Sequence, residues 1–156
     1  MAHVTVFGAG LVAGPVVRHL LDSSSHTVTV AARSVDRAEA LLGGNPRGKA
    51  VAFDIADADA LDRLVAESDV CVSMLPYIHH VAIAERCLAL GKHLVTTSYV
   101  SPAMRALDAR AVAHAVEARQ VARGLGRGDD VVGGDREVRV GERDRDHRRA
   151  EPLQRR

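Results

Sequence analysis

Two glycines near the start of the chain have the spacing of a turn that binds phosphate groups. In the stretch VTVFGAGLVAGPVV, Gly8 and Gly10 follow a short apolar run, and Ala13 holds the third position of the pattern G-x-G-x-x-G/A. Gly8 permits a tight turn, and Gly10 lets a pyrophosphate approach the backbone because it has no side chain. The pattern predicts a pyrophosphate-binding turn, and the alternative is a purely structural turn.

Arg33 and Ser34 are the next residues whose types suggest chemistry, at the end of the run VTVAARS. Sites that prefer NAD place Asp or Glu here to bind the ribose 2′-hydroxyl, and this run ends without a carboxylate. An arginine fork and a hydroxyl would hold a 2′-phosphate, with Arg37 one helical turn further on. This favours NADP as the cofactor, with NAD as the alternative. In the other interpretation Arg33 is only solvent-exposed and Ser34 only caps a helix, although Ser34 can do both.

Further binding positions follow from the rule that ligands lie beyond the carboxyl ends of parallel strands. Asp54 and Ile55 end the third apolar run and are expected to border the adenine. The turns at residues 74–77 and 96–101 end the fourth and fifth runs and are expected to face the nicotinamide.

The histidines and cysteines do not form a pattern typical of a metal site. His79 and His80 are adjacent, so on a helix they point about 100° apart and do not readily chelate one ion. Cys71 and Cys87 both lie in apolar surroundings. We therefore expect no metal site, and two buried free thiols rather than a disulfide.

Five short, valine-rich runs predict strands, and each is followed by a segment with helical periodicity. The runs are HVTVFG, HTVTVAA, KAVAFD, DVCVSML and HLVTTS. Repeated strand–helix alternation predicts an α/β fold, a doubly wound parallel sheet of the Rossmann type with helices on both faces. The first helix is expected to begin near Leu11 or Val12, which leaves Pro15 about one turn inside it.

Capping residues mark where most of the other helices begin and end. Ser34 is expected to cap the second helix, which Gly43 ends, and Asp57 or Asp59 the third. Ser101, followed by proline, is expected to open a helix over AMRALDARAVAHAV. In the segment IHHVAIAERCLAL, the residues expected to share one buried face are Ile78, Val81, Ala82, Cys87 and Leu88.

The composition is that of one soluble domain. The chain has 156 residues, of which 47% are hydrophobic, and its net charge of +1 gives no reason to expect a nucleic acid partner. Its apolar runs are too short to span a bilayer, and Met1 leads directly into a strand-like run without a signal peptide. We expect a cytoplasmic protein that does not bind membranes.

The last third of the chain has a different composition. Every residue from Arg105 to Arg156 is one of only ten types, all of which can be encoded by codons that begin with G or C. This favours a shifted reading frame somewhere after Met104, and the alternative is a genuine, charge-rich disordered tail. The expected domains are a dinucleotide-binding Rossmann domain over residues 1–116 and an Arg/Gly/Asp-rich tail without a fold over 117–156. The nucleotide sequence around codon 105 would distinguish the two.

Several stretches together resemble the N-terminal part of the saccharopine dehydrogenase (saccharopine reductase) family. The resemblance covers residues 3 to about 108, and SMLPYIHH and VTTSYVSPAMRALD are more distinctive than the glycine turn. It implies an oxidoreductase of lysine metabolism that uses NADP or NAD to make or break a secondary amine between an amino acid and a carbonyl compound.

The resemblance also implies roles for individual residues along the cofactor. The pyrophosphate would contact Gly8, Gly10, Leu11 and Val12. The 2′-phosphate would contact Arg33 and Ser34, and the adenine would lie between Asp54 and Ile55. The residues that would line the nicotinamide end are Leu75, Pro76, Ser98, Tyr99 and Val100.

The chain departs from the family after the helix opened by Ser101. Family members continue into an inserted α/β domain that binds the amino-acid substrate, and this sequence does not resemble it. The catalytic residues are therefore unknown, and a small amino-acid-derived substrate is expected only where a substrate domain is supplied. Two alternatives stay open: a free-standing NAD(P)-binding module or sensor, and a small oxidoreductase that completes its site as a homodimer.

Overall fold

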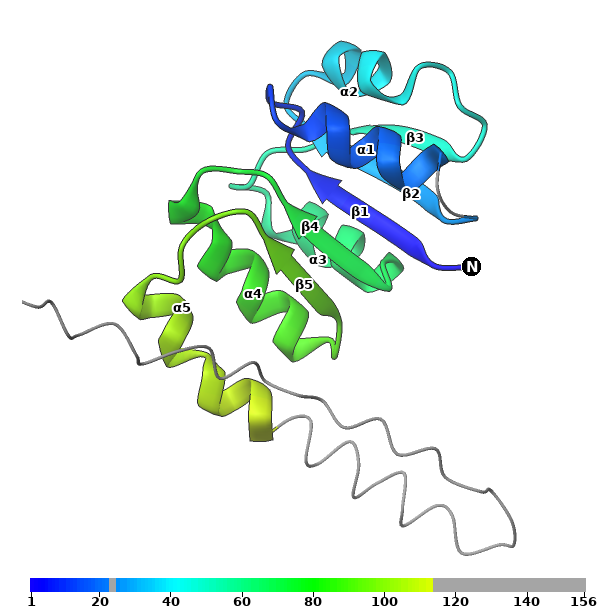
Figure 1. Cartoon of the computed structure of the whole chain (residues 1–156). Helices are drawn as coiled ribbons and strands as arrows, with labels where there is room; N and C mark the ends of the chain where they lie inside the picture. Colours follow the sequence, from blue (N-terminus) through cyan, green and yellow to red (C-terminus); the bar gives the residue numbers. More distant parts are fainter. Residues whose placement is uncertain (23–24, 114–156) are drawn as a thin grey trace, which may run out of the picture.

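The strands form one parallel sheet in the order β3-β2-β1-β4-β5 (Figure 1). A computed structural model describes residues 1–22 and 25–113, so the predicted boundary at residue 116 and the tail 117–156 lie outside the described residues. The strands are β1 His3–Phe7, β2 Thr27–Ala32, β3 Gly48–Ala52, β4 Val70–Ser73 and β5 His93–Thr96. All neighbouring pairs are parallel, and the chain crosses from β3 back to β4 beside β1.

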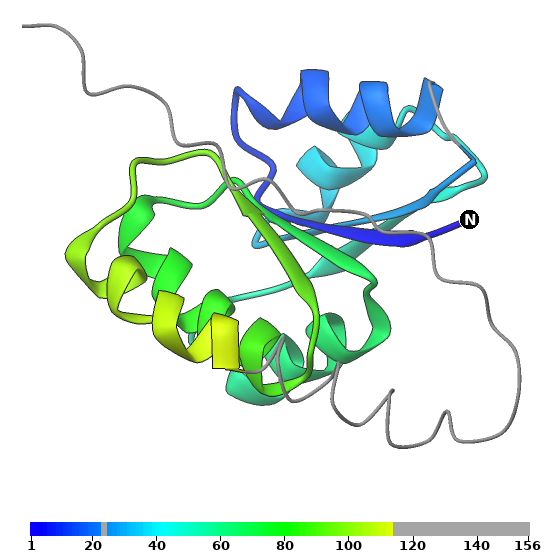
Figure 2. The same cartoon turned by 60° about the horizontal axis from the view of Figure 1, so that its bottom comes forward.

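Helices cover both faces of this sheet, and the prediction of a doubly wound Rossmann-type fold is confirmed. The helices are α1 Ala13–Asp22, α2 Val35–Leu42, α3 Ala58–Glu67, α4 His80–Ala89 and α5 Pro102–Ala106, with a 3₁₀ turn at Tyr77–His79. Helices α1 and α2 lie on one face, and α3 and α4 lie on the other (Figures 1 and 2). Helix α5 packs against α4.

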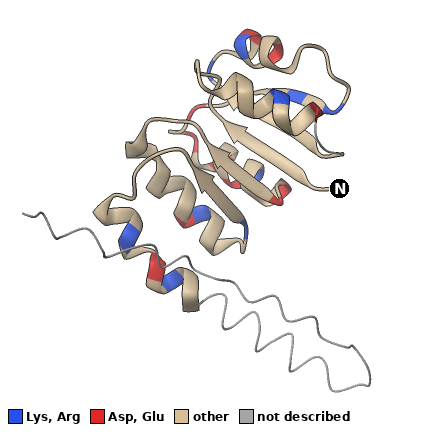
Figure 3. Cartoon of the chain, viewed as in Figure 1, with Lys and Arg blue, Asp and Glu red and all other residues tan. Residues whose placement is uncertain are grey.

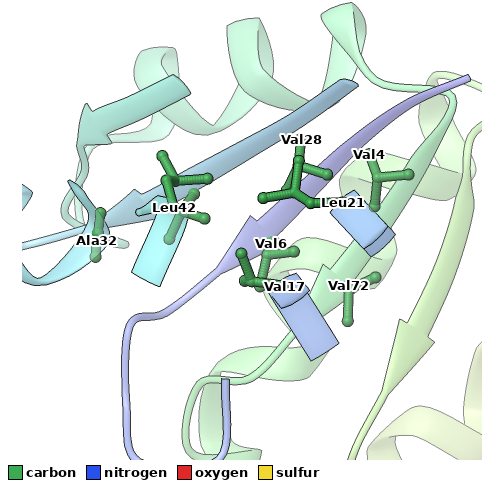
Figure 4. Packing of buried hydrophobic residues seen from close by; sticks show 10 residues of the cluster. Val4, Val6, Val17, Leu21, Val28, Ala32, Leu42 and Val72 are labelled. Carbon is green, nitrogen blue, oxygen red and sulfur yellow. The ribbon is translucent and has the colours of Figure 1, made fainter. Parts of the chain in front are cut away.

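The core beneath α1 and α2 is aliphatic, because alternate residues of each strand point to the same face. Figure 4 shows Val6 of β1, Val28 of β2 and Val72 of β4 close to Val17 and Leu21 of α1. All of these side chains are buried. Their period-two spacing is the pattern from which the strands are predicted.

The opposite face holds the aromatic and sulfur-containing part of the core. Phe7 and Phe53 pack with ring centroids 5.2 Å apart, at an angle that is neither stacked nor perpendicular. Cys71 of β4 and Cys87 of α4 are buried free thiols, as predicted. Contact with Cys71 and burial together raise the pKa of the Cys87 thiol, so this thiol stays protonated at neutral pH.

The predicted helix caps are confirmed, and the structure chooses between the two open candidates. The Ser34 hydroxyl accepts a hydrogen bond from Arg37 N at the start of α2, and Gly43 ends α2 in the left-handed region at φ 58°. Asp57, rather than Asp59, caps α3 through Ala60 N. Ser101 caps α5, with proline at the first helical position.

Two expectations about the later helices hold only in part. The buried residues of α4 are His80, Ile83, Ala84 and Cys87, and Ile78 is 64% exposed. The 3₁₀ turn before α4 changes the angular phase of the helix, so a face counted from Ile78 does not continue along it. The helix opened by Ser101 ends at Ala106, and helical residues resume at 108–113 after a turn at Leu107, whereas the expected helical residues 114–116 lie outside the described residues.

Among the described residues, the charged side chains lie on the helices and connecting loops, except for Lys49 on β3 (Figure 3). Within residues 1–22 and 25–113, no helix has the length and apolar character to cross a bilayer. The same ranges contain no group of three or more His, Cys, Asp or Glu side chains placed to hold a metal ion.

Candidate functional site

The glycine turn connects β1 to α1 at the carboxyl edge of the sheet. Gly8 is buried with φ +108°, a conformation that L side chains rarely adopt, and its N–H donates to the carbonyl of Ala31 at 2.8 Å. A Cβ on Gly8 would lie 3.2 Å from Leu75 Cδ2. A Cβ on Gly10 would meet nothing within 4 Å, so the fold of this chain does not require glycine at position 10.

A groove of about 720 Å³ runs across the carboxyl ends of β1, β2, β3 and β4. Its walls come from the glycine turn and from the residues that follow the next three strands. The lining residues are Gly8, Ala9, Gly10, Ala31, Ala32, Arg33, Ser34, Arg37, Phe53, Asp54, Ile55, Met74, Leu75, Pro76 and His79. The location agrees with the rule that ligands of open α/β sheets bind beyond the strand ends.

The end of the groove beyond β2 is positively charged. Arg33 and Arg37 are both exposed and both line the groove. In the part of the chain that the structure describes, the ion pairs join Arg86 to Asp62 and Arg110 to Glu85, so neither groove arginine is neutralised by a carboxylate. Ser34 lies between them, and a hydroxyl that accepts a hydrogen bond from a helix can still donate its own hydrogen.

The third strand supplies an apolar floor and a constrained carboxylate. Phe53 is buried and its N–H donates to the carbonyl of Ala32, which continues the sheet beyond the end of β3. The Asp54 side chain accepts from Ala56 N at 2.9 Å, which closes a tight turn and holds the carboxylate at the groove wall. Ile55 lies beside it, half-buried.

The structure brings most of the predicted site residues together and leaves the others apart. Those that line the groove are Gly8, Gly10, Arg33, Ser34, Asp54, Ile55, Leu75 and Pro76. Those that do not are Leu11, Val12, Ser98, Tyr99 and Val100. Leu11 and Val12 are exposed ahead of α1, which begins at Ala13 and not at either of them. Roles for these residues stay predictions.

Several lining residues were not predicted from the sequence. Ala31 and Ala32 end β2, so the strand-end rule could have found them once the end of that strand was fixed. Met74 follows β4 and belongs to the turn 74–77 that was expected to face the nicotinamide. His79 was considered only as a metal ligand. It lines the groove because the 3₁₀ turn directs this part of the chain back toward the strand ends.

A buried hydrogen-bonded chain next to the groove was also missed. His80 Nδ1 lies 2.8 Å from Ser73 Oγ, and His80 Nε2 lies 2.8 Å from Ser98 Oγ. Burial, and then the neighbouring His79, lower the pKa of His80, so its imidazole is neutral at pH 7. No local pattern signals this contact, because its three residues lie on separate elements.

The groove matches what a dinucleotide phosphate requires. A small, uncrowded position at Gly10 leaves room for a pyrophosphate at the backbone N–H groups that precede α1. Two unpaired guanidinium groups and a hydroxyl are suited to a phosphate monoester on the ribose. If the pyrophosphate occupies the glycine turn, a carboxylate and apolar side chains after β3 flank the position that remains for a base.

Comparison with known proteins gives the same result. The family model described as the saccharopine dehydrogenase NADP binding domain matches residues 4–119. The chain is 38% identical over 112 residues to "Saccharopine dehydrogenase [NADP(+), L-glutamate-forming]" of Schizosaccharomyces pombe, which is 72% of this chain and 25% of that protein. It is 33% identical over 106 residues to the mitochondrial alpha-aminoadipic semialdehyde synthase of Bos taurus, 67% of this chain and 11% of that one.

The solved structures agree. The apo, histidine-tagged saccharopine dehydrogenase (L-Glu forming) of Saccharomyces cerevisiae superposes with a TM-score of 0.66 at 35% identity, over 70% of this chain and 24% of that one. A short-chain dehydrogenase/reductase (wide type) of Veillonella parvula gives a TM-score of 0.53 at 16% identity, over 61% and 46%, and shows the shared fold alone. The chain spans about a quarter of the length of the saccharopine dehydrogenases that it matches.

The groove, its glycine turn and the extent of the match lead to one assignment: the chain belongs to the saccharopine dehydrogenase NADP-binding domain family.

Proposed function

We propose that the groove binds NADP(H) and that this chain is the cofactor-binding part of an oxidoreductase acting on CH–NH bonds. The observation that carries the proposal is the pairing of an uncrowded glycine turn after β1 with unneutralised Arg33 and Arg37 after β2. The pyrophosphate would lie at Gly8 and Gly10, and the 2′-phosphate between the arginines and Ser34. The adenine would lie against Asp54 and Ile55.

When bound, NADP⁺ accepts a hydride, and NADPH donates one, at a carbon atom bonded to nitrogen. The residues of this chain would bind and orient the cofactor. Leu75 and Pro76, which follow β4, would limit access of water to the nicotinamide end. A hydride acceptor must be held about 3–3.5 Å from its donor, and we infer that residues beyond the part described here hold it.

The substrate is proposed to be a secondary amine derived from two amino-acid skeletons, as in lysine metabolism. The support is the name of the matched relatives, of which this chain spans only a part. A cytoplasmic location and a homodimer are further parts of the proposal. Fractionation of cells and size-exclusion chromatography with light scattering would test them.

The cofactor preference can be tested by isothermal titration calorimetry of the full chain with NADPH and NADH. Arg33→Ala is expected to weaken NADPH binding by about 10- to 100-fold, because a hydrogen bond to a charged group contributes about 1.5–3 kcal/mol. NADH binding is expected to change by less than about threefold, since NADH has no 2′-phosphate.

Arg63→Ala is the matched control, because Arg63 lies on α3 and does not line the groove. Equal affinities of the unaltered chain for NADPH and NADH would contradict the proposal. An Arg33→Ala protein whose NADPH affinity is unchanged would contradict the role of Arg33.

A further inference from the structure

The hydrogen-bonded chain Ser73–His80–Ser98 joins three separate parts of the fold. Ser73 is the last residue of β4 and is fully buried. His80 is the first residue of α4 and is 2% exposed. Ser98 lies in the loop between β5 and α5, and the imidazole bridges the two hydroxyls with a distance of 2.8 Å on each side.

A neutral imidazole suits this position. It has one ring N–H that donates and one ring nitrogen that accepts, and a serine hydroxyl can supply either complement. Both ring nitrogens are therefore satisfied at once, in a place where an unpaired ring nitrogen would be costly. A protonated imidazole would have two donors, and its charge would be buried and close to His79.

The loop that His80 reaches is otherwise exposed. Tyr99 is 100% exposed and Val100 is 63% exposed. Ser98 and Ser101 are half-buried, and Ser101 caps α5 by accepting from Met104 N at 3.1 Å. The loop is thus attached at two serines, one to the sheet through His80 and one to α5, with Tyr99 and Val100 between them.

The sheet end of this attachment lies beside the groove. Ser73 is followed directly by Met74 and Leu75, and His80 is preceded directly by His79, and all three of these neighbours line the groove. Strand β5 pairs with β4, so the loop after β5 leaves the sheet next to that wall (Figure 1).

We propose that His80 is a positioning residue that fixes the loop 97–101 to the end of β4, so that Tyr99 is held next to the β4 end of the groove. The place of Tyr99 beside a nicotinamide rests on the proposed function. The attachment itself does not, because it is made by residues of this chain alone.

The chain contains a natural fluorescent reporter for the attachment. It has no tryptophan and only two tyrosines, Tyr77 and Tyr99. In the Tyr77→Phe variant, tyrosine fluorescence therefore comes from Tyr99 alone. Time-resolved fluorescence anisotropy of the full-length Tyr77→Phe protein then measures how freely Tyr99 moves without any nucleotide present. We expect a fast component from rotation of the exposed Tyr99 ring and a slow component from tumbling of the domain, because the attached loop moves with the domain.

Variants in this background separate attachment from general stability. Ser98→Ala is expected to lower the amplitude of the slow component, because it removes the loop end of the hydrogen-bonded chain. Ser68→Ala is the matched control: Ser68 is another buried serine, bonded to Thr5 and Leu64, and lies away from the loop. It should lower stability and leave the anisotropy unchanged. Equal anisotropy decays in these two variants would overturn the proposal.

Two substitutions of the imidazole test the bridge itself. The amide nitrogen of glutamine can occupy the place of Nε2, and that of asparagine the place of Nδ1. His80→Gln is therefore expected to keep the slow decay of Tyr99, and His80→Asn to lose it. The opposite order would contradict the bridge. If either His80 variant does not fold, the comparison of Ser98→Ala with Ser68→Ala still tests the attachment.

Bound NADPH gives a second measurement, because it absorbs tyrosine emission. We expect NADPH to quench Tyr99 in the Tyr77→Phe protein, and to quench it at least about twofold less in the Ser98→Ala variant at the same calorimetric saturation. Equal quenching would overturn the positioning role. If calorimetry showed no NADPH binding at all, the proposed function would be wrong. The anisotropy measurements, which need no nucleotide, would still show whether His80 holds the loop.

Discussion

At the scale of the single residue, the two glycines of the turn are needed for different reasons. Gly8 has a positive φ and lies against Leu75 and Met74, so glycine is needed there for the fold. Gly10 has open space around its missing side chain, so glycine is needed there only if a ligand fills that space. This contrast allows folding and binding to be separated by substitution.

Alanine at each position is expected to have a different effect. Gly8→Ala should lower the free energy of unfolding by about 1–3 kcal/mol, because alanine is strained at φ +108°. Gly10→Ala should leave stability within about 0.5 kcal/mol and weaken NADPH binding at least about tenfold. Urea unfolding and calorimetry measure the two effects. A Gly10→Ala protein that binds NADPH normally would show that no phosphate approaches this residue.

His80 is expected to make stability depend on pH. Its pKa in the folded protein is lowered from the ordinary 6.5, first by burial and then by His79. Below about pH 6.5 the unfolded chain therefore binds more protons at this residue than the folded chain does, and stability is lost as the pH falls. The full contribution is present above that pH.

Urea unfolding between pH 7.5 and about pH 5 measures this dependence. The His80→Gln protein should lose less stability over the same range, because glutamine does not titrate. The other histidines are common to both proteins, so they cancel in the comparison. Parallel stability curves would show that His80 takes up no extra proton on unfolding.

At the scale of the elements, the residue that caps helix α2 also lines the groove. Ser34 caps α2 and lines the groove, whereas Asp57 caps α3 and does not line it. Losing either cap leaves an N–H group of the first helical turn without its partner.

Alanine at these two caps should therefore separate stability from binding. Ser34→Ala and Asp57→Ala are each expected to lower the free energy of unfolding by about 1 kcal/mol. Only Ser34→Ala should also weaken NADPH binding, by about three- to tenfold. If both variants bound NADPH equally well, Ser34 would be a cap and nothing more.

The sequence predicts those elements whose signals are local. The glycine turn, the valine-rich strands and the cap at Ser34 depend on residues a few positions apart, and all of them are found. The cap of α3 was predicted as Asp57 or Asp59, and it is Asp57. The buried face of α4 was missed, because the preceding 3₁₀ turn changes its phase. The bridge through His80 was missed because it joins residues from β4, α4 and the β5–α5 loop, which only the assembled sheet brings together.

The same distinction applies to the groove. Arg33, Ser34, Asp54 and Ile55 were predicted because they directly follow strands, and strand ends meet at one edge of a parallel sheet. The positions of Leu11 and Tyr99 could not be predicted from the strand ends, because the strand does not fix the course of loop residues that lie further along the chain.

At the scale of the whole molecule, the matched region is one part of a larger enzyme architecture. The chain spans 25% of its Schizosaccharomyces pombe relative. A purified chain of this sequence is expected to bind NADPH and to show no oxidation of saccharopine with NADP⁺, followed by absorbance of the reduced cofactor. The reason is that the chain matches only this part of its relatives, and turnover also requires residues that hold a hydride acceptor beside the cofactor. Sustained turnover by sequence-verified protein would contradict this.

The last strand has a consequence for how the protein behaves in concentrated solution. Val95 is 53% exposed on β5, and within the described residues the outer edge of β5 pairs with no other strand. An open edge with an apolar side chain is a template on which another chain can add a strand. Colloidal stability is therefore expected to be limited by this edge, and the apparent molar mass from light scattering should rise with protein concentration even while the core stays fully folded.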